Sequence, residues 1–122
     1  MNHYDYAHNL ACALKESDEY QDLLKARKEL EGDAKNKEML LELRRLQWDM
    51  QKAQVLQKEV DEVTRRRIEQ LGELAGANRT IQEYLKAEYR FGQIMADIQK
   101  ILSDALSDWF NAAAEFIADE GE

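Results

Sequence analysis

The sequence predicts an all-α protein, an elongated helical bundle of about five helices with two long antiparallel helices near residues 34–58 and 79–102 or beyond. Three observations lead to this fold class. The 122 residues contain no proline and only five glycines, whereas proline averages about 5% of residues in proteins. Ala, Leu, Glu, Lys, Gln and Arg, which lose little side-chain freedom in a helix, dominate the composition. No run of β-branched and aromatic residues alternates with the period of a strand.

Two shorter helices are expected at the start of the chain. Residues 3–16 place Ala7 and Leu10 on one apolar face, with the next members of that face one and two turns further along. Ser17 suits the N-cap of a second helix, because its hydroxyl can accept a hydrogen bond from a free backbone N–H. Gly32 is expected to end this second helix in the left-handed conformation that glycine adopts without steric cost.

A third helix is predicted from about Ala34 to Lys58, with Asp33 as its N-cap. Its apolar residues repeat with a seven-residue period, which is typical of a helix that packs along another helix. They are Met39, Leu43, Leu46, Met50 and Ala53. Residues 60–64 read as a connection in which Asp61 caps a fourth helix, and Gly76 ends that helix.

The fifth helix is the longest feature of the sequence, running from an Asn78 cap to about Ala118. It would extend roughly 60 Å if unbroken, whereas a compact globule of this length is only about 35 Å across. Either the helix breaks, or another chain covers the excess. Ser107 can cap a separate terminal helix, so residues 1–106 are expected to form the main domain and residues 107–122 an acidic amphipathic extension.

Two apolar faces on this long segment are candidate interaction sites. The predicted oligomer interface consists of Tyr84, Phe91, Met95, Ile98 and Leu102, which recur at helical spacing. The predicted partner-docking face consists of Trp109, Phe110, Phe116 and Ile117. Aromatic anchors on an amphipathic helix commonly insert into a partner's groove. The alternative is that this terminal segment folds back on its own bundle.

The charge distribution limits the expected partners. The formal net charge is -8, from 25 acidic and 17 basic residues. Six carboxylates and no Lys or Arg follow Lys100, so the first hundred residues carry 17 minus 19, or -2. Such a surface repels nucleic-acid phosphates and anionic lipid, so no direct nucleic-acid or membrane partner is expected. The polar N-terminus resembles no secretion signal, and we expect a cytoplasmic protein.

Candidate chemistry is sparse. Asp5, His8 and Cys12 lie three and four residues apart and can share a helix face, but a structural zinc site needs four ligands. Cys12 is expected instead to behave as a small buried hydrophobe. No phosphate-binding loop or nucleophile motif occurs, so we expect no enzyme, no cofactor and no metal. Two alternatives remain open: a metal- or redox-linked module that uses His8 and Cys12, and an RNA-associated regulator that uses Arg65–Arg67 and Arg79.

The order of elements resembles the YlbF/YmcA family of bacterial regulators of competence, and its YheA-like branch in particular. The matching residues are Ala7, Leu10, Leu14, Ser17 to Tyr20, Asp33, Leu43 to Gln54, Asn78, Ile81 and Tyr84 to Glu88. The resemblance covers most of the chain, from about Tyr4 to Leu106. One departure is Gln57, which stands where relatives often have glycine between the third and fourth helices.

This resemblance implies an all-helical fold, self-association and no catalytic activity. Characterised members act as adaptors that influence competence, sporulation and biofilm formation, and they are linked to a membrane-tethered ribonuclease and RNA processing. The expected partners are therefore a second copy, other YlbF/YmcA-type proteins or a ribonuclease-associated complex. Some members hold iron–sulfur clusters with additional cysteines, and this property is not carried over because Cys12 is the only cysteine.

Overall fold

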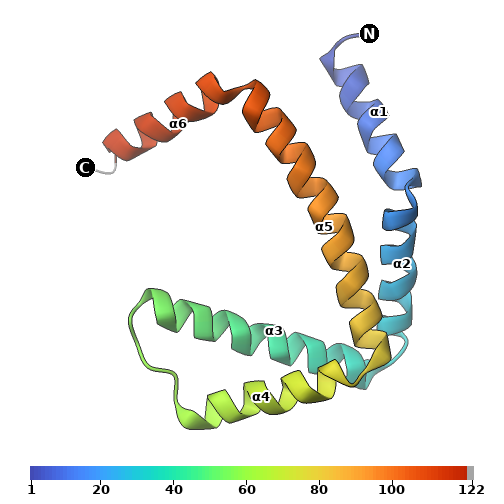
Figure 1. Cartoon of the computed structure of the whole chain (residues 1–122), viewed down its shortest axis with the longest axis vertical. Helices are drawn as coiled ribbons and strands as arrows, with labels where there is room; N and C mark the ends of the chain where they lie inside the picture. The colour runs from blue at the N-terminus through green and yellow to red at the C-terminus, as the bar shows by residue number, and fades with distance from the viewer. Residues whose placement is uncertain (121–122) are drawn as a thin grey trace. The chain divides into compact units, whose positions relative to one another are not determined.

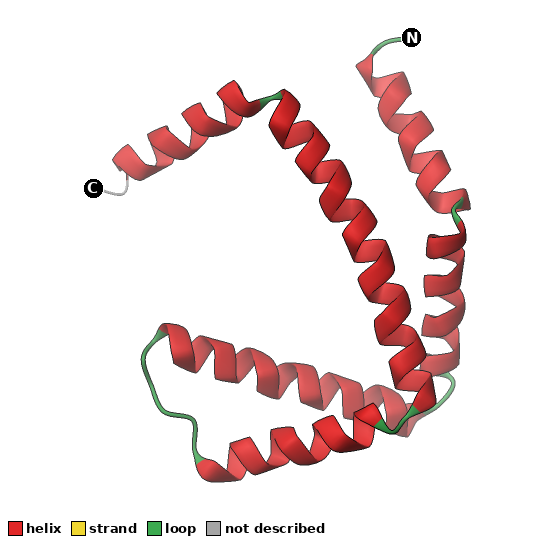
Figure 2. Cartoon of the chain, viewed as in Figure 1, coloured by secondary structure: helices red, strands yellow, loops and turns green. Residues whose placement is uncertain are grey.

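The described part of the chain, residues 1–120, folds into six α-helices. The structure, a computed structural model, describes the backbone of residues 1–120 and the side chains of residues 1–116. The helices are α1 (His3–Glu16), α2 (Asp18–Glu31), α3 (Ala34–Val55), α4 (Glu62–Gly76), α5 (Arg79–Ala105) and α6 (Ser107–Glu120), and residues 1–120 contain no strand (Figures 1 and 2). The all-α prediction is therefore confirmed, with six helices in place of about five. Two compact units, Met1–Glu88 and Tyr89–Glu122, are described separately below.

Side-chain caps start the helices where the sequence predicts. The Ser17 hydroxyl accepts from the Tyr20 N–H at 3.2 Å, and the Asp61 carboxylate accepts from the Thr64 N–H at 2.7 Å. The other N-caps that accept a backbone N–H are Asn2, Asp33 and Asn78. These hydrogen bonds satisfy backbone donors that have no partner within the helix. They fix the starts of α1 to α5.

The two predicted helix ends near Gly32 and Lys58 need correction. Gly32 has φ -69, which is right-handed, so α2 ends without the left-handed residue expected there. The third helix ends at Val55 and not at Lys58, because Gln57 adopts φ 55. The Lys58 N–H then bonds to the Ala53 carbonyl at 2.8 Å. This is a Schellman ending in which a glutamine takes the usual glycine position.

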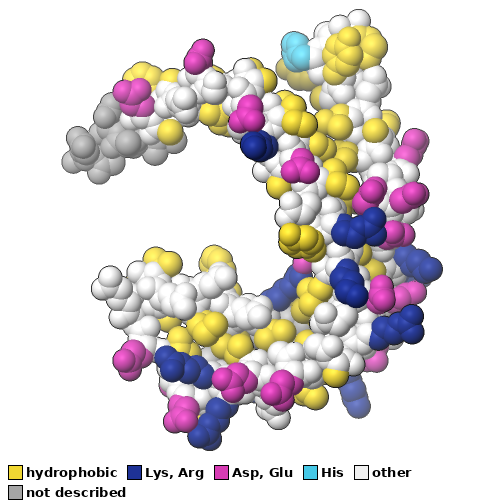
Figure 3. Space-filling view, in the orientation of Figure 1, with side chains coloured by type: hydrophobic (Ala, Val, Ile, Leu, Met, Phe, Trp, Pro, Cys, Tyr) yellow, Lys and Arg dark blue, Asp and Glu magenta, His cyan; other side chains and the backbone are white. Residues whose placement is uncertain are grey.

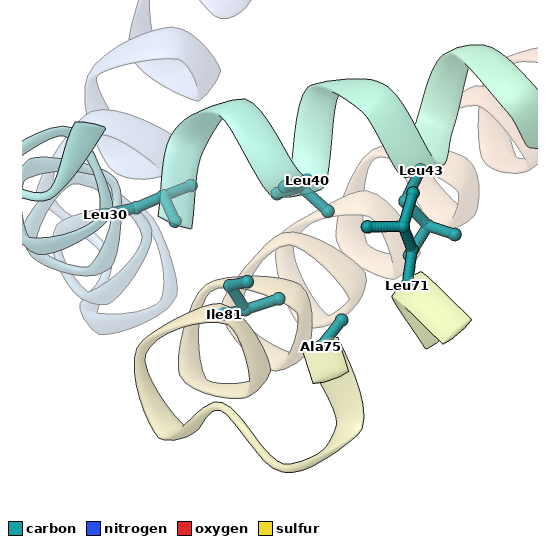
Figure 4. Packing of buried hydrophobic residues seen from close by; sticks show 6 residues of the cluster. All are labelled: Leu30, Leu40, Leu43, Leu71, Ala75 and Ile81. Carbon is teal, nitrogen blue, oxygen red and sulfur yellow. The ribbon is translucent and has the colours of Figure 1, made fainter. Parts of the chain in front are cut away.

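The core of the first unit lies where α2, α3, α4 and the start of α5 meet. Its buried members are Leu30, Leu40, Leu43, Leu71, Ala75 and Ile81 (Figure 4). Ile81 is 0% exposed and Leu71 is 2% exposed. Met39 and Leu46 of the predicted seven-residue stripe pack against this cluster and are partly buried. A single cluster therefore holds these four helices together.

Helices α3 and α4 form a hairpin, so the antiparallel neighbour of α3 is α4 (Figure 1). A bidentate ion pair joins the hairpin, because the Arg67 guanidinium donates to the two oxygens of Glu42 at 2.9 and 3.1 Å. The hydrogen bond from Arg67 lowers the pKa of Glu42. The start of α5 contacts α3 through the Asn78 amide, which donates to Asn36 at 2.7 Å.

The second unit contains the rest of α5 and all of α6. The two helices are separated at Leu106, whose N–H still bonds to the Leu102 carbonyl at 3.0 Å. Its own carbonyl accepts from the N–H groups of Trp109 and Phe110. The long segment therefore breaks at Leu106, and Ser107 is the first residue of α6 and not its N-cap. None of the side chains of residues 89–116 is buried.

Truncation of the fully buried core residue should destabilise the first unit strongly. We expect Ile81→Ala to lower the free energy of unfolding by about 2–5 kcal/mol, because it removes apolar contacts and leaves a cavity. Val63→Ala is the matched control, since Val63 is 78% exposed. Urea denaturation followed by circular dichroism measures both; equal effects of the two changes would contradict the assigned core.

The hairpin ion pair should make stability depend on pH in the acidic range. The pKa of Glu42 lies below its ordinary value of 4.5, so the carboxylate stabilises the folded state above that pH and loses its contribution as pH falls through the lowered pKa. Wild type should therefore exceed Glu42→Gln in thermal stability at neutral pH, and the difference should shrink below pH 4.5. A difference that is constant with pH would show that the ion pair does not form.

Candidate interaction surfaces

The predicted oligomer interface forms one continuous face of α5. Tyr84, Phe91, Met95, Ile98 and Leu102, called the α5 stripe below, follow one another at spacings of seven, four, three and four residues. At about 100° per residue these spacings place all five side chains on one narrow side of the helix. Leu102 is 52% exposed, and the other four are half-buried. The stripe thus reaches solvent along most of the helix.

Tyr84, at the first end of this stripe, is engaged within the first unit. Its ring packs against the core cluster, and its hydroxyl donates to Glu88 at 2.9 Å. Arg44 pairs with the same carboxylate, and its guanidinium carbon lies 5.8 Å from the centre of the Tyr84 ring. Burial raises the pKa of Tyr84, and the hydrogen bond to Glu88 raises it further. Tyr84 therefore anchors α5 to α3 of its own chain.

The predicted docking face on α6 is apolar and open. Trp109 is 66% exposed, Phe116 is 69% exposed and Phe110 is 41% exposed. The Trp109 and Phe110 rings meet edge to face, with centroids 4.9 Å apart. Ile117, the fourth predicted member, lies outside the described side chains. We call Trp109, Phe110 and Phe116 the α6 face; hydrophobic side chains reach the surface over α5 and α6 in Figure 3.

A third apolar surface lies on α3, and sequence reasoning missed it. Leu41, Trp48 and Val55 are 57%, 66% and 83% exposed, and their seven-residue spacing aligns them along one side of the helix. We call them the α3 stripe. Leu41, Trp48 and Val55 form a second seven-residue repeat beside the buried one. The prediction for the third helix considers only the buried repeat.

The other candidate residues do not converge into a site. Cys12 is exposed, which corrects the expectation that it is buried. In the part of the chain that the structure describes, no group of three or more His, Cys, Asp and Glu side chains is placed to hold a metal ion. In the arginine cluster, Arg66 pairs with Glu62 at 2.9 Å and Arg67 pairs with Glu42. These two cations are therefore engaged in ion pairs within the chain.

The helical fold and its open apolar faces define a class of small helical protein whose surfaces are suited to protein contacts. Residues 3–107 match the family described as "Control of competence regulator ComK, YlbF/YmcA", and the chain belongs to this family. The resemblance deduced from the sequence is thereby confirmed. Among residues 1–120, no helix has the length and apolar character needed to cross a membrane.

Relatives of similar length support this assignment. UPF0342 proteins from Desulfitobacterium hafniense and Halothermothrix orenii are 33% and 37% identical, over 88% and 84% of this chain and 87% of each relative. A solved structure, "Protein of Unknown Function (DUF964) from Bacillus stearothermophilus", has a TM-score of 0.68 at 19% identity. It covers 85% of this chain and 91% of its own, and at that identity it supports the fold alone.

The Tyr84 contacts can be tested by titration. Because the pKa of Tyr84 is raised above 10.0, its phenol should ionise after an unperturbed tyrosine, and the stability it contributes should persist at neutral pH and disappear as pH rises through the raised pKa. The ultraviolet difference between wild type and Tyr84→Phe isolates this group. In Glu88→Gln the titration should move toward lower pH; an unchanged midpoint would exclude the Glu88 contact.

Proposed function

We propose that this protein is a non-enzymatic regulatory adaptor that acts by self-association and by contacts with other proteins. The observation that carries the proposal lies in the second unit: residues 92–116 belong to amphipathic helices and include no buried side chain. Most helical stability in proteins comes from packing an apolar face, so helices of this kind gain stability when that face is covered. Burying one large apolar side chain contributes about 1.5–3 kcal/mol. A partner surface is the natural source of that burial.

A second copy is the partner that best fits the later part of the α5 stripe. The three- and four-residue steps over Met95, Ile98 and Leu102 are the pattern with which one helix packs along another. In a two-fold dimer the same stripe meets itself, so the contact closes and covers the α5 stripe of both copies. Tyr84 would mark the end of this contact, since it packs on its own core.

The perturbed ionisable groups support a structural and not a catalytic use of the polar side chains. Among the residues whose side chains the structure describes, the groups with shifted pKa values are Glu42, Arg44, Asp61, Arg67 and Tyr84. Asp61 caps α4, and the other four belong to the Glu42–Arg67 pair and the Arg44–Tyr84–Glu88 cluster. Each shift has a cause in packing or capping, so none calls for a reaction.

Family membership supports the regulatory part of the proposal. The family model names control of competence, and we infer a cytoplasmic regulator whose partners include other YlbF/YmcA-type proteins or a ribonuclease-associated complex. The α6 face is the proposed docking surface for a YlbF/YmcA-type protein, which includes a second copy of this chain. The net charge of -8 disfavours direct binding to nucleic acid or anionic membrane, since both carry the same sign of charge.

Self-association is tested by placing charges on the α5 stripe. Met95→Asp together with Leu102→Asp should weaken dimerisation at least about 100-fold, because two carboxylates would be buried without partners. The matched control is Gln93→Asp with Ala96→Asp, which adds the same charges on exposed positions away from the stripe.

Sedimentation velocity measures the dimer population of both variants, and circular dichroism checks their helicity. The control should retain the wild-type dimer. Equal association of the two variants, or a wild-type protein that is monomeric throughout, would contradict the proposed interface.

A further inference from the structure

Helix α3 presents basic residues beside its exposed apolar stripe. Leu41, Trp48 and Val55 are interleaved with Lys37, Arg45 and Lys52, and all six side chains are exposed. Arg44 lies on the same side but is paired with Glu88 of α5. At about 100° per residue, the three other cations lie within roughly 60° of the stripe, whereas Glu38, Glu42 and Asp49 project further toward the α4 side. Glu42 confirms this direction, since it pairs with Arg67 of α4. The stripe is therefore both apolar and positively charged.

Helix α6 presents the opposite combination. Trp109 and Phe116 are seven residues apart, and Asp108 and Glu115 precede them with the same spacing, so the two carboxylates flank the two aromatic side chains. All four side chains are exposed. No Lys or Arg follows Lys100. The α6 face is therefore apolar and negatively charged.

The α6 face is shorter than the α3 stripe and shares its spacing. Leu41 to Val55 spans 14 residue steps, about 21 Å at 1.5 Å per residue, whereas Trp109 to Phe116 spans seven steps, about 10 Å. The seven-residue step that both surfaces contain allows the α6 face to pack along half of the α3 stripe. Opposite charges beside an apolar contact steer association and disfavour other registers.

We propose that the α6 face of one copy docks on the α3 stripe of a second copy. The proposal rests on the self-association proposed above and names the partner of α6. Helix α6 follows α5 after the single residue Leu106, so a dimer held by α5 would keep the α6 face of each copy close to the other chain. Exchange in both directions covers two α3 stripes and two α6 faces in one closed dimer.

The test uses two full-length variants whose charges are reversed on opposite surfaces. Variant one carries Arg45→Glu and Lys52→Glu on α3, and variant two carries Asp108→Lys and Glu115→Lys on α6. Each homodimer then brings like charges together. A mixed dimer pairs acidic α6 with basic α3 in one direction and basic α6 with acidic α3 in the other, so both contacts are attractive.

Native mass spectrometry of the equimolar mixture, with one variant isotopically labelled, measures the ratio of mixed to like dimers. Docking between copies predicts an excess of mixed dimers of at least about 10-fold over the statistical 1:2:1 distribution. A statistical distribution in a protein that still dimerises overturns this docking and leaves the α5 interface standing. The same statistical distribution is expected if α6 docks on α3 of its own copy. In that case the like charges meet within each variant chain, whichever chain it pairs with. A monomeric wild type overturns both proposals.

A second pair of variants guards against loss of folding. Arg45→Gln with Lys52→Gln, and Asp108→Asn with Glu115→Gln, neutralise the same exposed charges without introducing repulsion. Each should weaken the dimer and reduce the dependence of its dissociation constant on salt, because fewer charge pairs are screened. A salt dependence identical to that of wild type in both variants overturns the proposal.

Discussion

An apolar helix face must be covered, and this requirement determines how the chain can be used. The first unit meets it through one cluster centred on Ile81, where α2, α3, α4 and the beginning of α5 converge. The same α5 continues to Ala105, and its later residues contribute no buried side chain among residues 89–116. One helix thus serves first as part of a core and then as an exposed amphipathic surface. The proposed adaptor role follows from this change along α5.

Polar contacts within the first unit fix α4 and the beginning of α5 to α3. Glu88 accepts from Tyr84 and pairs with Arg44, so the last residue of the first unit is tied to α3. The Arg67–Glu42 pair similarly fixes α4 to α3. Because these charges are partly exposed, their individual contributions to stability are modest. Their effect is to set which faces of α3 and α5 point inward, and therefore which apolar stripes remain outside.

Much of the fold could be read from the sequence because its signals are local. Caps at Ser17, Asp61 and Asn78 depend on short side chains that reach backbone donors within three residues, and the missing proline allowed long helices. The left-handed ending at Gln57 could not be read in this way, since a glutamine there is tolerated only when the surrounding hydrogen bonds hold it. The prediction of a left-handed Gly32 was wrong for the converse reason: a glycine permits that conformation without requiring it.

The candidate interaction surfaces were only partly predictable. Periodicity located the apolar α5 stripe and α6 face, but it does not report whether a face is covered. For that reason Cys12 was expected to be buried and the α3 stripe was overlooked. Sedimentation equilibrium of the wild-type chain tests the central claim most directly. The account predicts a mass near twice 14.3 kDa at about 10 µM, which dissociates on dilution. A mass of 14.3 kDa up to about 100 µM would contradict it.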